Sequence, residues 1–324
     1  MSNEPFQNGY EQNVSSVFQK SVIELFERHL KAGSAYAPAA ASVLTEVIKS
    51  SEEETIMGLE VQLKQAADAI LKTAPMTAFV SLKASTELFL RFVIRTSLEF
   101  SDFEECKRRL IERGEYFKGR TEASRDKIAQ VGERFIQDGS VILTHGNSRV
   151  VAAVFERAAK TKRFRVYVTE SRPDGSGYSF AERLLSAGVS VTIILDSSVG
   201  FIMDQVDSVL VGAEGVAENG GIVNRIGSLQ VALVASSYNK PVFVAVESYK
   251  FSRIYPLRQR DLPCSDKYKE PWHPLLPEVT VSKGIQFENP ASDFTPPSLI
   301  SLLFTDLGVL TPAAVSDELI RLYQ

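Results

Sequence analysis

The first 138 residues carry apolar side chains at helical spacing. Between residues 14 and 31 they recur every three or four positions, and Gly33 follows where a helix could be capped. The same spacing returns in four further segments, which are residues 40–48, 56–71, 85–100 and 121–136. Gly139 follows the last of them as a stop signal. We therefore predict an N-terminal all-helical domain over residues 1–138.

A different pattern begins at Val141. Short, continuously apolar runs rich in β-branched residues now alternate with helical patterns, and these runs are residues 141–144, 166–169, 191–195, 208–212 and 242–246. Continuous apolarity indicates that both faces of a strand are buried, which is typical of a parallel sheet covered by helices on both sides. The pattern predicts an α/β protein whose second domain, residues 139–324, is a Rossmann-like doubly wound parallel sheet.

The end of the chain is less regular. Residues 249–297 hold eight of the fourteen prolines and the only tryptophan, Trp272, which predicts largely irregular backbone. An apolar run at residues 299–304 is followed by a helix that Thr311 opens, with Pro312 at its first position.

Composition and charge narrow the classes of partner. The chain has 324 residues, of which 44% are hydrophobic and 23% charged, as expected for a globular protein. Its formal net charge of −4 and its sequence pI of about 5.6 disfavour binding to phosphate backbones, so we predict no direct nucleic-acid partner. No run reaches the ~18 apolar residues of a membrane span, and the N-terminus lacks the apolar core of a signal peptide. We expect no membrane association and a location in the cytosol.

The cysteines exclude common metal motifs. Cys106 and Cys264 are the only two, and neither belongs to a C-x-x-C pair, so we predict no metal site and a reducing compartment. Basic neighbours could lower the pKa of Cys106, but a buried helix cysteine is the favoured interpretation.

Candidate chemistry follows the ends of the predicted strands. In open parallel sheets, ligands bind beyond the carboxyl ends of the strands, so the residues after the first, second and fourth strands should share one crevice. Glycine allows close approach of backbone, a serine or asparagine can open a helix whose free N–H groups suit an anion, and arginine suits phosphate. We place Asn224 and Arg225 on the first turn of such a helix. The predicted ligand residues are Thr144, Gly146, Asn147, Ser148, Glu170, Arg172, Glu214, Asn224 and Arg225.

Each of these loops also has a plainer interpretation. Residues 144–149 could form an ordinary turn and helix cap, and Glu170 with Arg172 could be a surface ion pair. His145 could act as an acid or base, although a histidine whose hydrogen bonds are satisfied within a turn is favoured. The acidic run at residues 52–54 is interpreted as a solvated helix start.

Several stretches of the chain resemble a known family. They are ELFLRF at 87–92, SLEFSDFEECKRRLIERGEYF at 97–117, THGNSRVV at 144–151, VYVTESRPDGSG at 166–177, the segment from VTIILD at 191–196 to VNRIGS at 223–228, and PPSLISLLFTDLGVLTPAAVSDELIRLY at 296–323. On these stretches the sequence is similar, over nearly its whole length, to the alpha-subunit family of eukaryotic translation initiation factor 2B.

That family is similar in fold to the methylthioribose-1-phosphate and ribose-1,5-bisphosphate isomerases, which use a cysteine and an aspartate to move a proton within an opened sugar phosphate. The resemblance places Gly146 at the cysteine position and Glu214 at the aspartate position. A glycine has no side chain to transfer a proton, and the extra methylene of glutamate displaces the carboxylate, so the resemblance implies no catalytic residue and no enzyme activity. NRIGS at 224–228 stands where the isomerases have NKIGT. A sugar phosphate or other small phosphate is therefore implied as a ligand, and no cofactor is required.

The resemblance also implies the partners. The chain should be a regulatory, non-catalytic subunit of the guanine-nucleotide exchange factor for initiation factor 2. It should form a homodimer through its α/β domain and so join two sets of beta, delta, gamma and epsilon subunits into a decamer. Its helical region, above all residues 35–58, should help to receive the phosphorylated alpha subunit of initiation factor 2, which would favour a poorly exchanging assembly by population shift. The contacts expected there are Thr45, Glu46, Ile48 and Glu54.

Two other functions remain as alternatives. An active sugar-phosphate isomerase could use Glu214 with His145 as an unconventional acid, and turnover of ribose-1,5-bisphosphate would identify it. A purely structural adaptor would have an empty pocket, and sugar phosphates would then leave its melting temperature unchanged.

Overall fold

The computed structural model describes residues 5–74, 76–100, 102–262 and 288–323. The chain divides into two compact units, residues 1–122 with 322–324 and residues 123–321, and each has its own hydrophobic core. The division between these units falls earlier in the chain than residue 138, where the helical sequence pattern ends.

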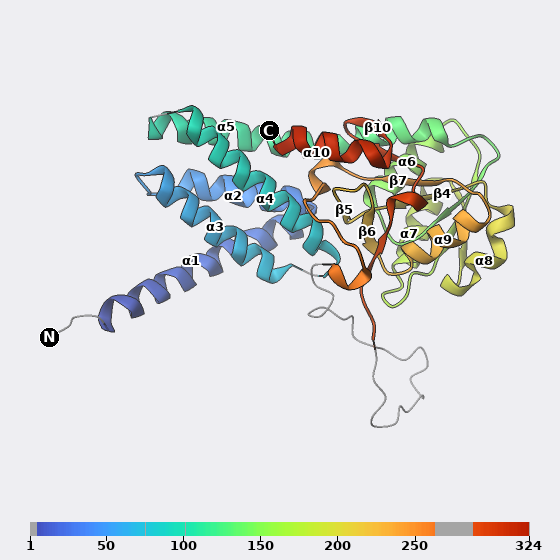
Figure 1. The fold of residues 1–324 in the computed structure, drawn as a ribbon, viewed down its shortest axis with the longest axis horizontal. Coiled ribbons are helices and arrows are strands. Elements are labelled where there is room, and N and C mark those ends of the chain that lie inside the picture. Colours follow the sequence, from blue (N-terminus) through green and yellow to red (C-terminus); the bar gives the residue numbers. More distant parts are fainter. Residues whose placement is uncertain (1–4, 75, 101, 263–287, 324) are drawn as a thin grey trace, which may run out of the picture. The chain divides into compact units, whose positions relative to one another are not determined.

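The first unit is built from helices (Figure 1). They are α1 (Pro5–Lys31), α2 (Tyr36–Ser50), α3 (Ile56–Thr73), α4 (Met76–Glu99) and the first part of α5 (Phe103–Gly132). Each of the five predicted amphipathic segments falls on one of these helices, which confirms the helical N-terminal region. Phe26, Leu44, Ile48 and Leu63 are almost fully buried in its core. Burial of side chains of this size contributes roughly 1.5–3 kcal/mol each, so the packed core stabilises the bundle.

Helix α5 begins at Phe103, well before its predicted start at residue 121. Residues 103–113 are mostly charged, so the apolar stripe on which the prediction rests is weak there. Ion pairs along the helix replace it, because Arg108 contacts Glu105 at 2.6 Å and Glu112 at 2.7 Å, at spacings of three and four residues.

The second unit holds a seven-stranded sheet with the strand order β10-β9-β7-β4-β1-β2-β3. Its strands are β1 (Val141–Thr144), β2 (Arg165–Thr169), β3 (Ser190–Ile194), β4 (Ser208–Gly212), β7 (Val242–Ala245), β9 (Leu302–Thr305) and β10 (Gly308–Leu310). Neighbouring strands are parallel except for β9 with β10. The predicted Rossmann-like parallel sheet is thereby confirmed.

Helices connect and flank these strands. They are α6 (Arg149–Ala158), α7 (Ser176–Ser186), α8 (Val199–Ile202), α9 (Ser228–Ser237) and α10 (Val315–Tyr323). Thr311 precedes a short 3-10 turn with Pro312 at its start, and α10 continues from it, as the sequence predicts. Strand β1 is buried along its whole length, whereas β3 forms one edge of the sheet and is largely exposed.

A second, three-stranded antiparallel sheet corrects one prediction. It consists of β5 (Gly215–Val216), β6 (Ile222–Arg225) and β8 (Ser292–Thr295) in the order β5-β6-β8. Asn224 and Arg225 therefore end a strand and do not lie on the first turn of a helix, since α9 begins only at Ser228. The prediction was wrong because β6 pairs with residues far along the chain, which local sequence does not show.

The proline-rich segment lies only partly within the described residues. Ser248–Lys250 and Gln259–Asp261 form short 3-10 turns, and β8 follows near the end of the segment. Residues 263–287, with Cys264 and Trp272, lie outside the described part of the chain. Within the described part, no helix combines the length and hydropathy needed to cross a membrane.

Candidate functional site

Three neighbouring strands, β4, β1 and β2, end at the same edge of the parallel sheet. The loops that follow them carry most of the predicted ligand residues, and the end of β6 joins them through contacts described next. Ser148 caps α6 by accepting a hydrogen bond from the Val151 amide at 3.4 Å, as the sequence predicts, and Asn147 donates to the Ser179 hydroxyl at 3.1 Å. We call this region the strand-end crevice.

His145 ties the crevice together. Its Nδ1 lies 2.7 Å from the Thr169 hydroxyl, and its Nε2 lies 2.8 Å from the carbonyl oxygen of Ile226. Because a carbonyl oxygen only accepts, Nε2 carries the proton and Nδ1 accepts from Thr169. Burial lowers the pKa of the His145 imidazole, which favours this neutral form. The histidine thus joins three loops, and both of its nitrogens are already engaged.

The loop after β2 is held by a carboxylate that the sequence analysis missed. Asp196, which follows β3, accepts from the Ser171 amide at 2.9 Å and from the Arg172 amide at 2.7 Å. Ser171 has a φ of +59°, a left-handed conformation that costs energy for a residue other than glycine, and these bonds hold it there. Its hydroxyl accepts from the Gly146 amide at 2.9 Å, which joins the loops after β1 and β2.

Arg172, Arg225 and Lys250 each contact a carboxylate in the crevice. Arg172 lies 3.2 Å from Glu170, and the Arg225 guanidinium forms an ion pair with Asp174. Lys250 lies 2.9 Å from Glu247. The positive charges that could bind a phosphate are therefore already paired with carboxylates of the protein.

Lys250 is the second residue that the sequence analysis missed. It donates to the carbonyl oxygen of Ala213 at 3.0 Å, directly beside Glu214. Glu214 itself accepts from the Ser292 hydroxyl at 3.2 Å. Lys250 lies five residues beyond β7. The rule that ligands bind beyond strand ends therefore predicts it as well, once it is applied to the strand at residues 242–246.

The N-terminus of α9 is already occupied. Asp293 on β8 accepts hydrogen bonds from the Gly227 amide at 2.8 Å and from the Leu229 amide at 3.1 Å. The side-chain Nδ2 of Asn224 donates to the Ser228 hydroxyl at 2.8 Å. Asp293 therefore caps α9, and it occupies N–H groups that the sequence predicted to be free for an anionic ligand.

Asp293 should make folding stability depend on pH. Burial raises its pKa from 3.8 to about 7, so between these values the folded protein holds a proton that the unfolded chain releases. The free energy of unfolding should fall by about 4 kcal/mol as pH rises through this window. Urea unfolding from pH 4 to pH 8 should show this slope in the wild type and a flatter profile in Asp293→Asn. The exposed Asp204→Asn serves as the control, and an unchanged slope in Asp293→Asn would refute the assignment.

The predicted partner-binding residues divide into two groups. Thr45 and Ile48 are buried, and Thr45 donates to the Ala41 carbonyl oxygen at 2.7 Å, so neither can touch a partner directly. Glu46 is half exposed and lies 2.9 Å from His29 Nε2. Glu54 is exposed. Only these two remain candidates for direct contact.

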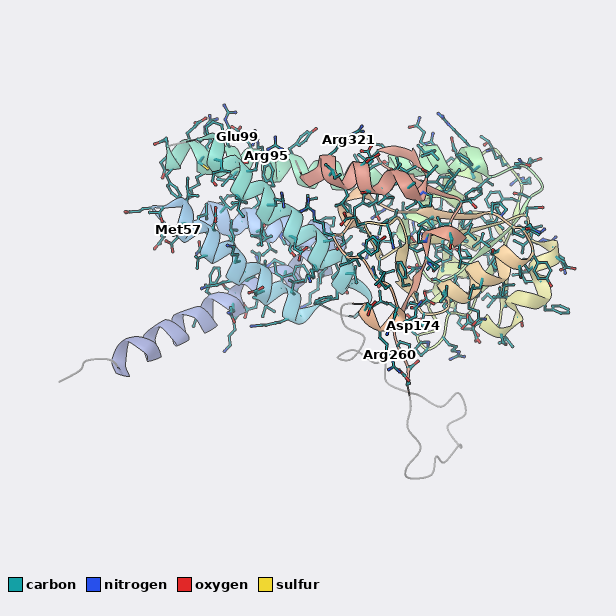
Figure 2. All side chains as sticks on the ribbon, in the orientation of Figure 1. Met57, Arg95, Glu99, Asp174, Arg260 and Arg321 are labelled. Carbon is teal, nitrogen blue, oxygen red and sulfur yellow. The ribbon has the colours of Figure 1, made fainter. Side chains whose placement is uncertain are left out.

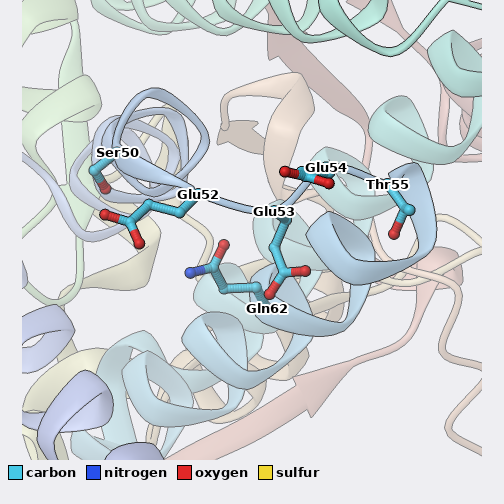
Figure 3. Close-up of a pocket in the computed structure, with 6 residues that line it drawn as sticks. All are labelled: Ser50, Glu52, Glu53, Glu54, Thr55 and Gln62. Atoms are coloured by element: carbon cyan, nitrogen blue, oxygen red, sulfur yellow. The ribbon is translucent and has the colours of Figure 1, made fainter.

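Glu54 lines a recess of about 510 Å³ between the end of α2 and the start of α3 (Figure 3). Its lining is polar and acidic, and it consists of Ser50, Glu52, Glu53, Glu54, Thr55 and Gln62. Thr55 caps α3 by accepting from the Gly58 amide at 3.1 Å, so the acidic run precedes a helix start, as predicted.

Metal and thiol chemistry find no support in the described residues. Across residues 5–74, 76–100, 102–262 and 288–323 there is no group of three histidine, cysteine or carboxylate side chains that could hold a metal ion. Cys106 is buried among the helices of the first unit, and burial raises the pKa of its thiol.

Comparisons with known proteins give a consistent result. The sequence model of the Initiation factor 2 subunit family matches residues 31–312. A translation initiation factor eIF2B subunit alpha from Dictyostelium discoideum is 46% identical, over 93% of this chain and 96% of that protein. A ribose 1,5-bisphosphate isomerase from Archaeoglobus fulgidus is 33% identical, over 85% of this chain and 83% of that protein. A chain in the crystal structure of the tetrameric eIF2B-beta2-delta2 complex from C. thermophilum has a TM-score of 0.77 at 21% identity, with both chains covered to 100%.

Proposed function

This chain belongs to the Initiation factor 2 subunit family, and on that premise we propose that it is a regulatory, non-catalytic subunit of the guanine-nucleotide exchange factor for translation initiation factor 2. The observation that carries the proposal is the 46% identity to an eIF2B alpha subunit along nearly the full length of both chains. Its partners are then the beta, delta, gamma and epsilon subunits, a second copy of itself and the phosphorylated alpha subunit of initiation factor 2, all in the cytosol.

The geometry of the crevice supports the proposed lack of catalysis. Gly146 has a φ of +79°, and a Cβ at this position would lie 3.7 Å from the Cβ of Arg225. The position that the resemblance aligns with the isomerase cysteine therefore has no side chain. The Glu214 carboxylate is bound by Ser292. Proton transfer between adjacent carbons needs a donor and an acceptor placed to within a fraction of an ångström, and one of the two is missing here.

A sugar phosphate is the ligand that the crevice suits best. Arg172 and Arg225 supply guanidinium groups that can bind a phosphate in bidentate fashion, and Glu170 is placed to accept from sugar hydroxyls. Since the ligand would bind the folded protein alone, it would stabilise the fold and could act as an effector of assembly.

Thermal unfolding with ribose 5-phosphate tests the pocket. We expect the melting temperature to rise by about 5 °C at ligand concentrations about a hundredfold above Kd, and to rise much less in Arg225→Gln. Arg183→Gln, which removes an arginine paired with Glu156 on the surface of the same unit, is the matched control. No rise in the wild type would favour the structural adaptor with an empty pocket.

An active isomerase is the second candidate, and the 33% identity to the archaeal ribose 1,5-bisphosphate isomerase favours it. It would have to use Glu214 and His145, but both nitrogens of His145 are engaged in hydrogen bonds. Incubation with ribose-1,5-bisphosphate, followed by nuclear magnetic resonance, should show no aldose-to-ketose conversion. Turnover that is lost in Glu214→Gln would establish the isomerase instead.

The proposed homodimer requires an apolar surface, and the second unit has one. We define the α8–α9 surface as the exposed apolar residues Leu195, Phe201, Leu233 and Tyr238. The Tyr238 hydroxyl donates to the Gly200 carbonyl oxygen at 3.5 Å, and α8 and α9 lie side by side (Figure 1). Leu195 directly follows β3, the exposed edge strand of the sheet. Exposed apolar residues on neighbouring elements are typical of protein interfaces, which supports contact with a second copy here.

The phosphorylated substrate is proposed to bind the helical unit. Glu46 and Glu54 are the predicted contacts that the fold leaves accessible, and the acidic recess beside Glu54 suits a basic segment. Binding that favours one arrangement of the complex over another would reduce exchange without any chemistry in this subunit.

A further inference from the structure

The ion pair between Asp174 and Arg225 lies where a ligand phosphate would have to bind. Asp174 belongs to the loop between β2 and α7, and Arg225 ends β6. One carboxylate oxygen of Asp174 contacts the guanidinium, and the other accepts from the Ser176 amide at 3.0 Å. The Asp174 side chain is 27% exposed and the Arg225 side chain 15%. The carboxylate therefore lies between a guanidinium and a backbone donor, as a bound oxyanion would.

The same loop keeps an unused donor. Among the described residues, the Ser176 hydroxyl is buried and has no hydrogen-bond partner. Buried hydroxyl groups are nearly always paired, so this hydroxyl, two residues from Asp174, needs an acceptor that the described residues do not supply. A phosphate has more oxygens than a carboxylate and could bind Arg225 and Ser176 together.

We propose that Asp174 is an internal competitor of the ligand, so that a phosphate can bind Arg225 only after displacing the Asp174 carboxylate. This inference rests on the proposed phosphate-binding function of the crevice. It assigns residue 174 as the group that sets the affinity of the site for anions, and residues 173–175 as the segment that must move when the site fills.

The neighbouring contacts limit that movement to a short stretch. On one side, Asp196 fixes the amides of Ser171 and Arg172. On the other side, α7 begins at Ser176, and Gly177 packs against the end of β2. Between them, Gly175 has a φ of +65°. When the carboxylate leaves, the phosphate would take its place on the Arg225 guanidinium, so no buried charge would be left unpaired.

Titration of inorganic phosphate and of ribose 5-phosphate by calorimetry tests the proposal. Asp174→Asn removes the charge but keeps the shape, and we expect it to lower Kd about tenfold for both probes, because it removes a negative charge a few ångströms from the bound phosphate. The double variant Asp174→Asn with Arg225→Gln should lose this gain. Glu156→Gln, which removes a carboxylate paired with Arg183 at 2.6 Å on the same unit, is the matched control and should change Kd less than twofold.

The possible failures are distinguishable. Equal affinities of the wild type and Asp174→Asn would show that Asp174 does not compete with the ligand, whereas the proposed phosphate-binding function would be unaffected. Weaker binding of ribose 5-phosphate by Asp174→Asn, with phosphate unchanged, would overturn it as well and make Asp174 a sugar ligand. Absence of binding by both proteins would overturn the competition together with the phosphate-binding function.

Discussion

Replacing Phe201 with glutamate should convert the proposed homodimer into a monomer. Phe201 is 82% exposed, so its removal should not disturb the core of the subunit. In the dimer, however, a buried charge without a partner would replace an apolar anchor, and such changes at the centre of an interface raise Kd by about a hundredfold or more. Light scattering after size exclusion would measure the mass of both proteins.

The matched control is Met57→Glu. Met57 is 77% exposed on the helical unit (Figure 2), so the control places the same charge on another exposed apolar residue. We expect it to remain a dimer. A dimeric Phe201→Glu protein, or a wild type that is monomeric at every concentration, would contradict the assignment of the α8–α9 surface.

Replacing Gly177 with alanine should cost about 3 kcal/mol or more of folding stability. A Cβ at this position would overlap the carbonyl oxygen of Thr169, and backbone atoms at the end of a strand that is paired on both sides cannot move aside cheaply. The shift should also displace Glu170 and Ser171, so the affinity of the crevice for phosphate should fall. Urea unfolding measures the first effect and calorimetry the second.

Gly119→Ala is the control for this substitution. It lies in α5, and a Cβ there would meet nothing within 4 Å. Alanine is a better helix former than glycine by about 1 kcal/mol, so this variant should be as stable as the wild type or more stable. If both alanine variants had the same stability, α7 could move away from β2 at little cost, and the expected loss of stability in Gly177→Ala would be refuted.

Local sequence predicts much of the fold because most helices bury one apolar face and the inner strands are buried on both faces. The runs at residues 141–144 and 208–212 coincide with β1 and β4, since both strands are covered on two sides and admit few polar residues. Strand β6 escaped prediction because its polar end is stabilised by pairing with β8, which no local pattern reports. The early part of α5 escaped because ion pairs replace an apolar stripe there.

The candidate site divides in the same way. The rule that ligands bind beyond strand ends found the loops of Gly146, Glu170 and Glu214, since this depends only on strand order and direction. The pairing of Arg225 with Asp174 and the capping of α9 by Asp293 depend on side chains that come together only in the folded protein. Sequence therefore indicates which groups are available, whereas the fold decides which of them are already occupied.

We propose above all that this chain is a dimeric regulatory subunit that joins the other subunits of the exchange factor. Sedimentation velocity tests it most directly, with the chain alone and mixed with the beta, delta, gamma and epsilon subunits, in the absence and presence of ribose 5-phosphate. We expect a dimer for the chain alone and a decamer in the mixture, with exchange activity supplied by the other subunits. A monomer that sediments independently of those subunits under both conditions would contradict it.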